Sequence, residues 1–456
     1  MPTFIHLGED VLVKVLTSCD VYTVLCVSQV NRYLRIISMT KQIWIFLIQT
    51  LQSCSIIALP PGTELATRST KELIKMVKRT VTGPRTLACT SLLPPTIFHE
   101  VVLPAESPII REEYHYPIVK LVGGRCIVLV RREFLEVWDI FTQRKIYNRQ
   151  GRTDWPAAEL ARESIILGFI YRNEDNFETV EIRQIDLRSM DNELQAKITI
   201  SGYTSRGWYI SGDFAAITLR SSVVLFVNWR EQTAVLLGDV PPSQVDDVGF
   251  MSGHVIILST THNPEPLREA YLTVYSMADF AEFWVPISQL DFTQHISFTR
   301  ISPVRIEVPK LDNEPFRVQD SPYLCILPSP TRENTYQVVL GLGEYTPGDY
   351  DVRDPPGAVF YYLCTTSDSS NNRESTFCWQ SRATALVCHR PGNRYTYTGQ
   401  MVDWVGNVVH GPTVGTYGRI VLTYLDPEDL IVRDISPDGC VLASVIPDGL
   451  RVSWYE

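Results

Sequence analysis

The residues that could carry chemistry fall into short groups, and each group lacks a part that its reaction would need. His99-Glu100-Val101-Val102-Leu103 holds half of a His-Glu-x-x-His zinc motif, without the second histidine. In Gly249-Phe250-Met251-Ser252-Gly253 the serine is displaced from the centre of a Gly-x-Ser-x-Gly nucleophile turn. Gly341-Leu342-Gly343 opens like a dinucleotide-binding loop, but Thr346-Pro347 follow where a helix should begin. We therefore expect no enzyme active site from these motifs.

Metal binding is also disfavoured. Cys388-His389, with Cys364 and Cys378 upstream, has irregular spacing for a zinc site, which favours cysteines buried in strands. One loop is crowded with aspartates that could bind calcium, although a solvated turn is the favoured interpretation. These aspartates are Asp349, Asp351 and Asp354. The sequence predicts no cofactor.

Composition and charge limit the class of protein. The 456 residues carry 41 basic and 51 acidic side chains, and a net charge of −10 disfavours a nucleic-acid partner. The basic run Lys75-Met76-Val77-Lys78-Arg79 is read as a solvated helix face. Ten cysteines without a Cys-x-x-Cys pair, and the lack of an apolar stretch near eighteen residues, predict an intracellular protein, cytoplasmic or nuclear, away from membranes.

The first fifty residues must form short helices. Val11, Leu12, Val15 and Leu16 recur at helical spacing, and Asp20 is a plausible N-cap for a second helix that carries Val24. Two further stripes follow at i, i+3, i+4 and i+7. These are Val30, Tyr33, Leu34 and Ile37, and then Trp44, Leu47, Ile48 and Leu51. A unit this small cannot bury so much apolar surface alone, so a docking face is expected.

Three segments of this region resemble the F-box. Leu7-Gly8-Glu9-Asp10 followed by an apolar helix is similar to the Leu-Pro-x-Glu opening, with Gly8 in place of the usual proline. Val27–Arg35 is similar to the middle of the pattern, and Ile43-Trp44-Ile45-Phe46-Leu47 to its close. The order and spacing of all three segments match. A small helical bundle without a partner is the alternative.

The resemblance implies a role in protein ubiquitination. F-boxes bind the Skp adaptor of a Skp–cullin–F-box (SCF) ubiquitin ligase through apolar helices, so the expected partners are Skp, cullin through it, and a protein substrate. Carried over by position, the residues expected to bind the adaptor are Leu7, Gly8, Val11, Leu12, Val15, Leu16 and Val24. Residues 1–51 would be the F-box. Residues 52–84 would be a helical linker, with a capping box at Ser69-Thr70-Lys71-Glu72 and a stop at Gly83-Pro84.

Residues 85–456 predict an irregular, WD-like β-propeller. Paired apolar strands recur from Gly124, Glu163, Gly212 and Gly253, at spacings of 39, 49 and 41 residues, and weaker copies begin near Tyr323, Ala358, Gly418 and Gly439. Trp138-Asp139 resembles the dipeptide of WD-repeat blades. Two β-sandwiches in tandem are the alternative fold. The fold class is therefore a small helical unit followed by an all-β domain.

The ring is expected to close between the two ends of this domain. The segments 441–444 and 450–454 read as strands of a last blade, which strands near 86–88 and 100–103 would complete.

Substrate is expected to bind loops of the propeller, because only the loops can vary freely. Aromatic and basic side chains often anchor protein interfaces, so Trp208-Tyr209 are candidates. The main predicted substrate-binding set is Arg390, Arg394, Tyr395 and Tyr397. Two other functions remain open. One is a propeller scaffold that acts outside the ligase, and the other is a propeller enzyme with an axial site.

Overall fold

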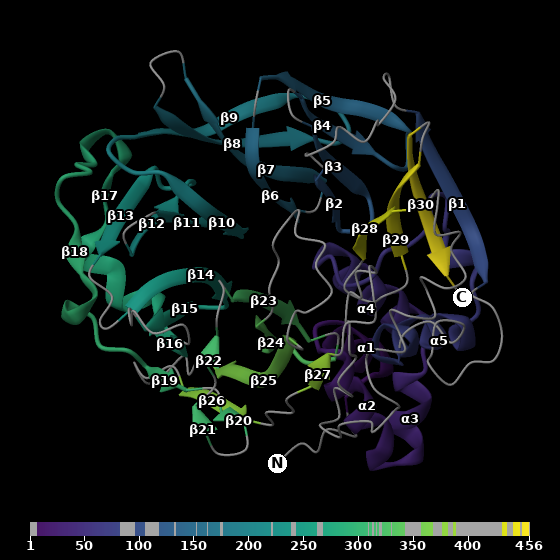
Figure 1. Ribbon diagram of the computed structural model, residues 1–456. Coiled ribbons are helices and arrows are strands. Elements are labelled where there is room, and N and C mark those ends of the chain that lie inside the picture. Colours follow the sequence, from purple (N-terminus) through teal and green to yellow (C-terminus); the bar gives the residue numbers. More distant parts are fainter. Residues whose placement is uncertain are drawn as a thin grey trace.

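A bundle of helices precedes a series of antiparallel sheets in the computed structural model (Figure 1). The structure describes residues 7–82, most of 96–342, and the strand segments 357–367, 376–381, 386–388, 431–435, 441–446 and 449–455. The helices are α1 (Glu9–Thr17), α2 (Val21–Val30), α3 (Arg32–Ser38), α4 (Lys41–Ser53) and α5 (Thr70–Thr82), with a 3-10 turn at Leu65–Thr67.

Side-chain caps define where three of these helices begin. Asp20 Oδ1 accepts a hydrogen bond from the Thr23 amide at 2.7 Å, and Asn31 Oδ1 accepts one from the Leu34 amide at 2.8 Å. Before α5, the Ser69 amide donates to Glu72 at 2.8 Å while the Glu72 amide donates back to Ser69 Oγ at 3.3 Å. The predicted N-cap at Asp20 and the predicted capping box are both confirmed.

The helical core extends past the predicted F-box boundary. Leu12, Leu16 and Trp44 are buried at its centre, and the Trp44 indole donates to the Ser38 carbonyl at 2.9 Å. Ile56 and Leu73, which lie in the predicted linker, are buried in the same core. Residues 9–82 therefore pack as one helical unit, because α5 covers a face of α4 that would otherwise be apolar and exposed.

The β domain contains six sheets of four or more strands among the described residues, and every pairing within them is antiparallel except one short parallel contact. Three sheets use consecutive strands: β2 (Ile118–Val122), β3 (Cys126–Arg131), β4 (Phe134–Asp139) and β5 (Arg144–Gln150); β6 (Thr153–Ala161), β7 (Ser164–Arg172), β8 (Glu178–Asp186) and β9 (Asn192–Ile200); β10 (Ser205–Ser211), β11 (Phe214–Leu219), β12 (Val223–Asn228) and β13 (Thr233–Gly238).

The last of these three sheets also takes up two short later strands, β17 (Val285–Pro286) and β18 (Ile296–Ser297). Of the other three sheets, one is again built from consecutive strands, and two take up strands from elsewhere in the chain. Their members are β14 (Ser243–Met251), β15 (His254–Thr261), β16 (Arg268–Ser276) with β19 (Arg305–Glu307) and β22 (Arg317–Val318); β23 (Tyr323–Pro328), β24 (Thr335–Leu342), β25 (Gly357–Ser367), β26 (Thr376–Ser381) and β27 (Leu386–Cys388); and β28 (Ile431–Ile435), β29 (Val441–Ile446), β30 (Gly449–Tyr455) and β1 (Ile97–Pro104). A short hairpin pairs β20 (Lys310–Leu311) with β21 (Glu314–Pro315).

The sheets follow one another around a common centre (Figure 1). Strand β2 contacts β28, β6 contacts β3 and β10, and β14 contacts β10 and β23. This radial series of antiparallel sheets is the architecture of a β-propeller and differs from two sandwiches in tandem. The four strong units predicted at 124, 163, 212 and 253 are confirmed as the pairs β3–β4, β7–β8, β11–β12 and β15–β16.

The weaker predicted units are confirmed only in part. Tyr323 does begin a sheet, and residues 441–446 pair with 449–454 as expected. The unit predicted near Ala358 is wrong, because β25 pairs with β24 and belongs to the sheet that Tyr323 begins. The unit near Gly418 lies outside the described residues.

Closure of the last sheet is confirmed. Strand β1 pairs antiparallel with β30, with Val101 opposite Val452 and Leu103 opposite Leu450. The last sheet therefore joins a strand from the start of the β domain to one near residue 455, and β30 is paired on both sides, by β1 and by β29. The part of this prediction that involves residues 86–88 lies outside the described residues.

Gly168 shows how tightly neighbouring sheets pack. A Cβ atom at Gly168, in β7, would lie 1.6 Å from Cη2 of Trp208, which comes from β10 of the next sheet. The predicted loop exposure of Trp208-Tyr209 is therefore wrong. Both residues lie in a strand, and their rings pack against the hydrophobic clusters between sheets. A glycine at 168 makes the space that the indole occupies.

We expect Gly168→Ala to lower the free energy of unfolding by about 2 kcal/mol, since the added methyl overpacks this contact. Gly207→Ala is the matched control. Its added Cβ would meet only Thr218 Oγ1, at an ordinary 3.5 Å. Chemical denaturation of both variants tests the expectation, which fails if the two lose equal stability.

Candidate protein-binding surfaces

The adaptor-binding residues predicted on α1 and α2 divide into two groups. Leu12, Leu16 and Val24 are 0–1% exposed and form part of the helical core. These three side chains cannot contact a partner unless the helices separate. By contrast, Leu7, Val11 and Val15 are 39%, 49% and 39% exposed. Alternation along one short helix explains the split, because side chains one position apart point about 100° apart around the helix axis.

Gly8 has a backbone that a proline could adopt. Its φ is −61° and its ψ is 149°, its carbonyl accepts hydrogen bonds from the Val11 and Leu12 amides at 3.0 and 3.1 Å, and an added Cβ would meet nothing within 4 Å. Proline fixes φ near −65°, so the departure of Gly8 from the F-box pattern leaves the local geometry of that pattern possible.

Exposed apolar side chains continue over the other helices of the unit. They come from α2, α3 and α4, and each of these side chains is more than a third exposed. The residues are Tyr22, Leu25, Val30, Tyr33, Ile36 and Phe46. Isolated exposed apolar residues are ordinary, whereas several on one small helical unit are typical of a protein-binding surface.

The helical unit is attached to the propeller at two places. At the first, the turn between β23 and β24 meets the start of α2. The Tyr22 amide donates to the Thr331 carbonyl at 2.8 Å, and the Glu333 amide donates to Asp20 Oδ2 at 3.2 Å. The Arg332 guanidinium stacks 3.9 Å from the Tyr22 ring. Asp20 thus caps α2 through Oδ1 and accepts a hydrogen bond from the propeller through Oδ2.

The second attachment lies at the closing sheet. The buried Trp454 indole donates to the Ala58 carbonyl at 3.2 Å, and Ala58 packs in the core of that sheet. A Cβ at Gly124 would lie only 2.0 Å from the Ala58 Cβ, and the φ of Gly124 is +64°. The chain after α4 is therefore fitted against the propeller, and two separate attachments fix the orientation of the helical unit.

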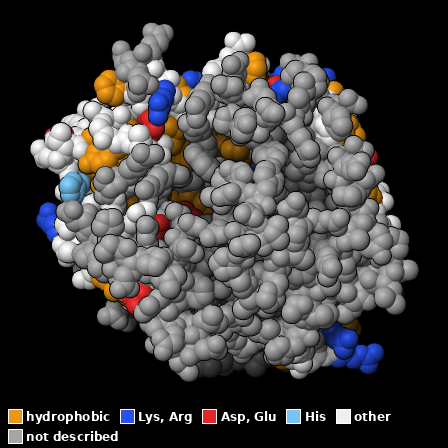
Figure 2. All heavy atoms as spheres, in the orientation of Figure 1, with side chains coloured by type: hydrophobic (Ala, Val, Ile, Leu, Met, Phe, Trp, Pro, Cys, Tyr) orange, Lys and Arg blue, Asp and Glu red, His pale blue; other side chains and the backbone are white. Residues whose placement is uncertain are grey.

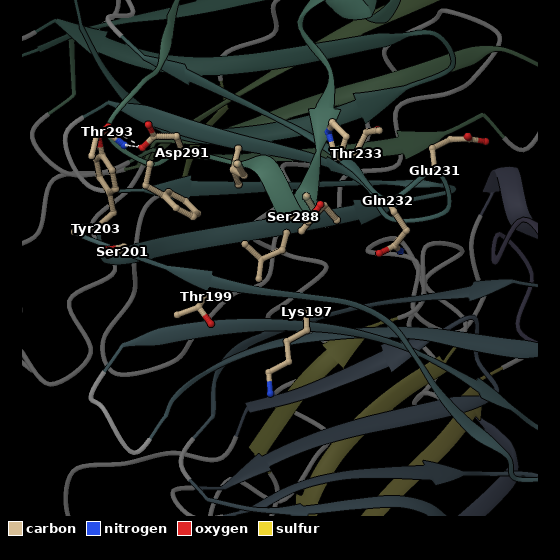
Figure 3. Close-up of a pocket in the computed structure, with 16 residues that line it drawn as sticks. Lys197, Thr199, Ser201, Tyr203, Glu231, Gln232, Thr233, Ser288, Asp291 and Thr293 are labelled. Atoms are coloured by element: carbon tan, nitrogen blue, oxygen red, sulfur yellow. Dashed lines mark hydrogen bonds between the residues drawn. The ribbon is translucent and has the colours of Figure 1, made fainter.

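A groove opens at the outer rim between β9 and the segment 286–293 (Figure 3). Its volume is about 1290 Å³. Partly buried apolar side chains, among them Tyr203, Ile287 and Phe292, pack against the core beneath it. Its polar lining includes Glu231, Gln232 and Asp291, as well as hydroxyl groups of threonine and serine. Such a mixture suits binding of a polypeptide more than it suits catalysis.

The segment that forms one wall of the groove leaves the propeller and returns to it. A 3-10 helix (Met277–Phe283) leads into β17 (Val285–Pro286), which pairs with β13, and β18 (Ile296–Ser297) also pairs with β13. Further 3-10 turns lie at Ile287–Gln289 and Phe298–Arg300. Buried Phe280 and Phe298 hold this excursion on the core. This excursion was not predicted from the sequence, in which its signal is a run of aromatic residues without strand periodicity.

Two buried carboxylates near the rim have structural partners. Glu181 accepts a hydrogen bond from the Tyr171 hydroxyl at 2.7 Å and pairs with Arg183 at 2.9 Å. Burial opposes its ionisation, but these contacts hold the pKa of Glu181 below its ordinary value. Glu136 likewise pairs with Arg131 at 2.9 Å and Lys145 at 3.2 Å. Ion pairs of this kind join neighbouring strands, and the lowered pKa of Glu181 does not suit a general acid.

Hydrophobic and acidic side chains border a hollow near the centre of the face shown in Figure 2. Within the described part of the chain, no group of three His, Cys, Asp or Glu side chains is placed to hold a metal ion.

None of the described helices is long and apolar enough to cross a membrane. The predicted substrate-binding set Arg390, Arg394, Tyr395 and Tyr397 lies outside the described residues, as do the aspartates near 350.

Comparison with known proteins gives only structural likenesses. No protein-family model and no curated protein matches the chain. Among solved structures, one from the mitotic checkpoint complex has a TM-score of 0.34 and 12% identity, over 74% of this chain and 75% of that chain. The WD40 repeats of RRP9 have a TM-score of 0.30 and 7% identity, over 80% of this chain and 100% of that chain. Likenesses this weak carry no argument, so the propeller architecture rests on the strand pairing.

Proposed function

We propose that this chain is a substrate-recognition adaptor of an SCF ubiquitin ligase. Its helical unit docks as an F-box to the Skp adaptor, and the Skp adaptor in turn binds cullin. Its propeller binds the protein to be ubiquitinated. The observation that carries the proposal is the exposed apolar surface on helices whose sequence resembles the F-box. The alternative of a propeller scaffold outside the ligase uses the same surfaces but does not require Skp.

The docking residues in this proposal are the exposed members of the predicted set. Leu7, Val11 and Val15 contact the Skp adaptor, and Gly8 sets the direction from which the chain enters α1. Leu12, Leu16 and Val24 act indirectly, since their burial holds the helices together. Apolar side chains that are exposed alone and buried in a complex give most of the affinity of such interfaces.

The two attachments of the helical unit support a receptor role. A ligase adaptor must present its substrate at a fixed distance and angle from the transferred ubiquitin. Contacts of Tyr22 with Thr331 and of Ala58 with Trp454 restrain the unit at two separated points. A single flexible linker would let the substrate-binding domain rotate freely.

The first test of this function is the double substitution Val11→Asp and Val15→Asp. We expect at least a tenfold loss of affinity for the Skp adaptor, equal to about 1.4 kcal/mol, because two charges would be desolvated in the interface. Phe177→Asp, at an equally exposed apolar residue of the propeller, is the control and should bind normally. Binding is measured by titration calorimetry and folding by circular dichroism.

Normal adaptor binding by the folded double variant would contradict the assignment. Gly8→Pro gives a second measurement in the opposite direction. Because the φ of Gly8 already suits proline, this variant should stay folded and bind the adaptor at least as tightly as the natural chain.

A further inference from the structure

Strand β9 has an edge that the described chain leaves open. It is the last strand of its sheet and pairs only with β8 among the described strands. In the two sheets that follow, the outer strands are covered, since β13 carries β17 and β18 and β16 carries β19 and β22. The outer strand β5 of the preceding sheet, like β9, pairs with one strand only among the described strands, so β9 is set apart by the groove that runs along its edge. Open edges of this kind accept strands from other chains.

The rim groove lies along this edge. Its lining includes Lys197, Ile198 and Thr199 of β9 and continues through the residues that follow the strand. At the other end of β9, the Gln232 amide donates to the Gln195 carbonyl at 2.5 Å and bridges the edge to the next sheet. The groove is larger than the roughly 300–1,000 Å³ of pockets for small ligands, which favours an extended polypeptide.

The charges in the groove indicate what such a polypeptide carries. Glu231 and Asp291 stand on different sides of the groove in Figure 3, and neither forms an ion pair within the described residues. Asp291 Oδ1 accepts hydrogen bonds from the Thr293 hydroxyl and amide at 2.7 and 2.8 Å, which keeps it ionised. The one basic residue in the lining, Lys197, already pairs with Glu181 at 3.7 Å. The groove is therefore complementary to positive charge.

We propose that this groove binds an extended segment of a partner protein, which adds as a strand to the edge of β9. Apolar side chains of the segment lie over Ile287 and Phe292, and its Lys or Arg side chains pair with Glu231 and Asp291. The main-chain hydrogen bonds supply affinity, while the two carboxylates select basic segments. This surface differs from the residues near 390 that the sequence nominated, and its occupation does not depend on docking of the helical unit to Skp.

The test uses the full chain without any adaptor and a fluorescein-labelled ten-residue peptide that alternates Lys and Val. We expect saturable binding, weakened at least tenfold by Glu231→Lys with Asp291→Lys. The matched control is Glu282→Lys with Asp279→Lys, which makes the same change of charge at exposed residues outside the groove and should change affinity less than twofold. A peptide that alternates Glu and Val should bind at least tenfold more weakly.

Hydrogen exchange decides whether the peptide adds as a strand. Amides within 197–203 should become protected when the Lys–Val peptide is bound, because those on the outer edge would gain carbonyl partners. Equal loss of affinity in the groove and control variants would show that only overall charge matters, and it would overturn the proposal. Protection confined to other parts of the chain would overturn it as well.

Discussion

Replacing Leu103 with alanine is expected to lower the free energy of unfolding by about 3 kcal/mol. Leu103 is 1% exposed, sits opposite Leu450 and belongs to the core that joins β1 to the last sheet. Truncation would leave a cavity at the closure of the ring, where the wall cannot collapse without separating β1 from β30. The measurement is denaturant unfolding followed by tryptophan fluorescence, to which Trp454 in this sheet contributes.

Val102 provides the control because it comes from the same strand and is 43% exposed. Val102→Ala keeps the pairing of β1 and removes little buried surface, so stability should change by less than about 0.5 kcal/mol. If Leu103→Ala were as mild as Val102→Ala, β1 would not be closing the ring.

Stability is expected to fall by about 3 kcal/mol as pH rises from about 4 to about 6, through one partly buried carboxyl group. Burial raises the pKa of Asp247 to about 6, and the hydrogen bonds from the Leu324 and Val248 amides offset this only in part. The unfolded chain releases this proton near its ordinary pKa of 3.8, whereas the folded chain holds it to about 6. Over that interval the folded state binds more protons, so raising the pH favours unfolding. Above the folded pKa the loss is complete and constant.

Asp247→Asn isolates this contribution from the other carboxyl groups. Asparagine cannot ionise, and its oxygen can still accept a hydrogen bond from the Leu324 amide, which Asp247 Oδ2 accepts at 2.8 Å. The stability of the variant relative to the natural chain should therefore increase between pH 4 and pH 6.5. Urea unfolding at several pH values measures this difference, and a difference that does not vary with pH would refute the expectation.

The predictable parts of the fold were those that short stretches of sequence specify. An N-cap such as Asp20, or the capping box at Ser69 and Glu72, forms between residues three positions apart. Paired apolar strands joined by tight turns are equally local, as at Gly212 and Gly253, where φ is +55° and +67°. Closure by β1 and β30 was predictable for another reason, since a propeller whose last sheet lacks a strand must obtain it from elsewhere.

The parts that sequence reasoning missed depend on which elements become neighbours. The residues around Gly168 in the sequence do not predict that the Trp208 ring will occupy the space beside its Cα atom. Leu12 and Val11 are similar apolar residues one position apart, and only the packing of α4 against α1 makes one buried and the other exposed. The rim groove was missed because its two walls, near 199 and 290, meet only after the segment 286–293 folds back onto β13.

The contact between Ala58 and Trp454 also affects the order in which the chain can fold. The two residues are 396 positions apart. At about 5–20 residues per second, a ribosome needs roughly 20–80 seconds to synthesise the intervening chain. Once β1 has been made it lacks its partner β30 for the rest of that interval, and the helical unit lacks its attachment to Trp454 and, until Thr331 is made, the attachment of Tyr22 as well. The nascent chain therefore presents an unpaired strand and exposed helices for tens of seconds, a period in which a chaperone would have to shield them from aggregation.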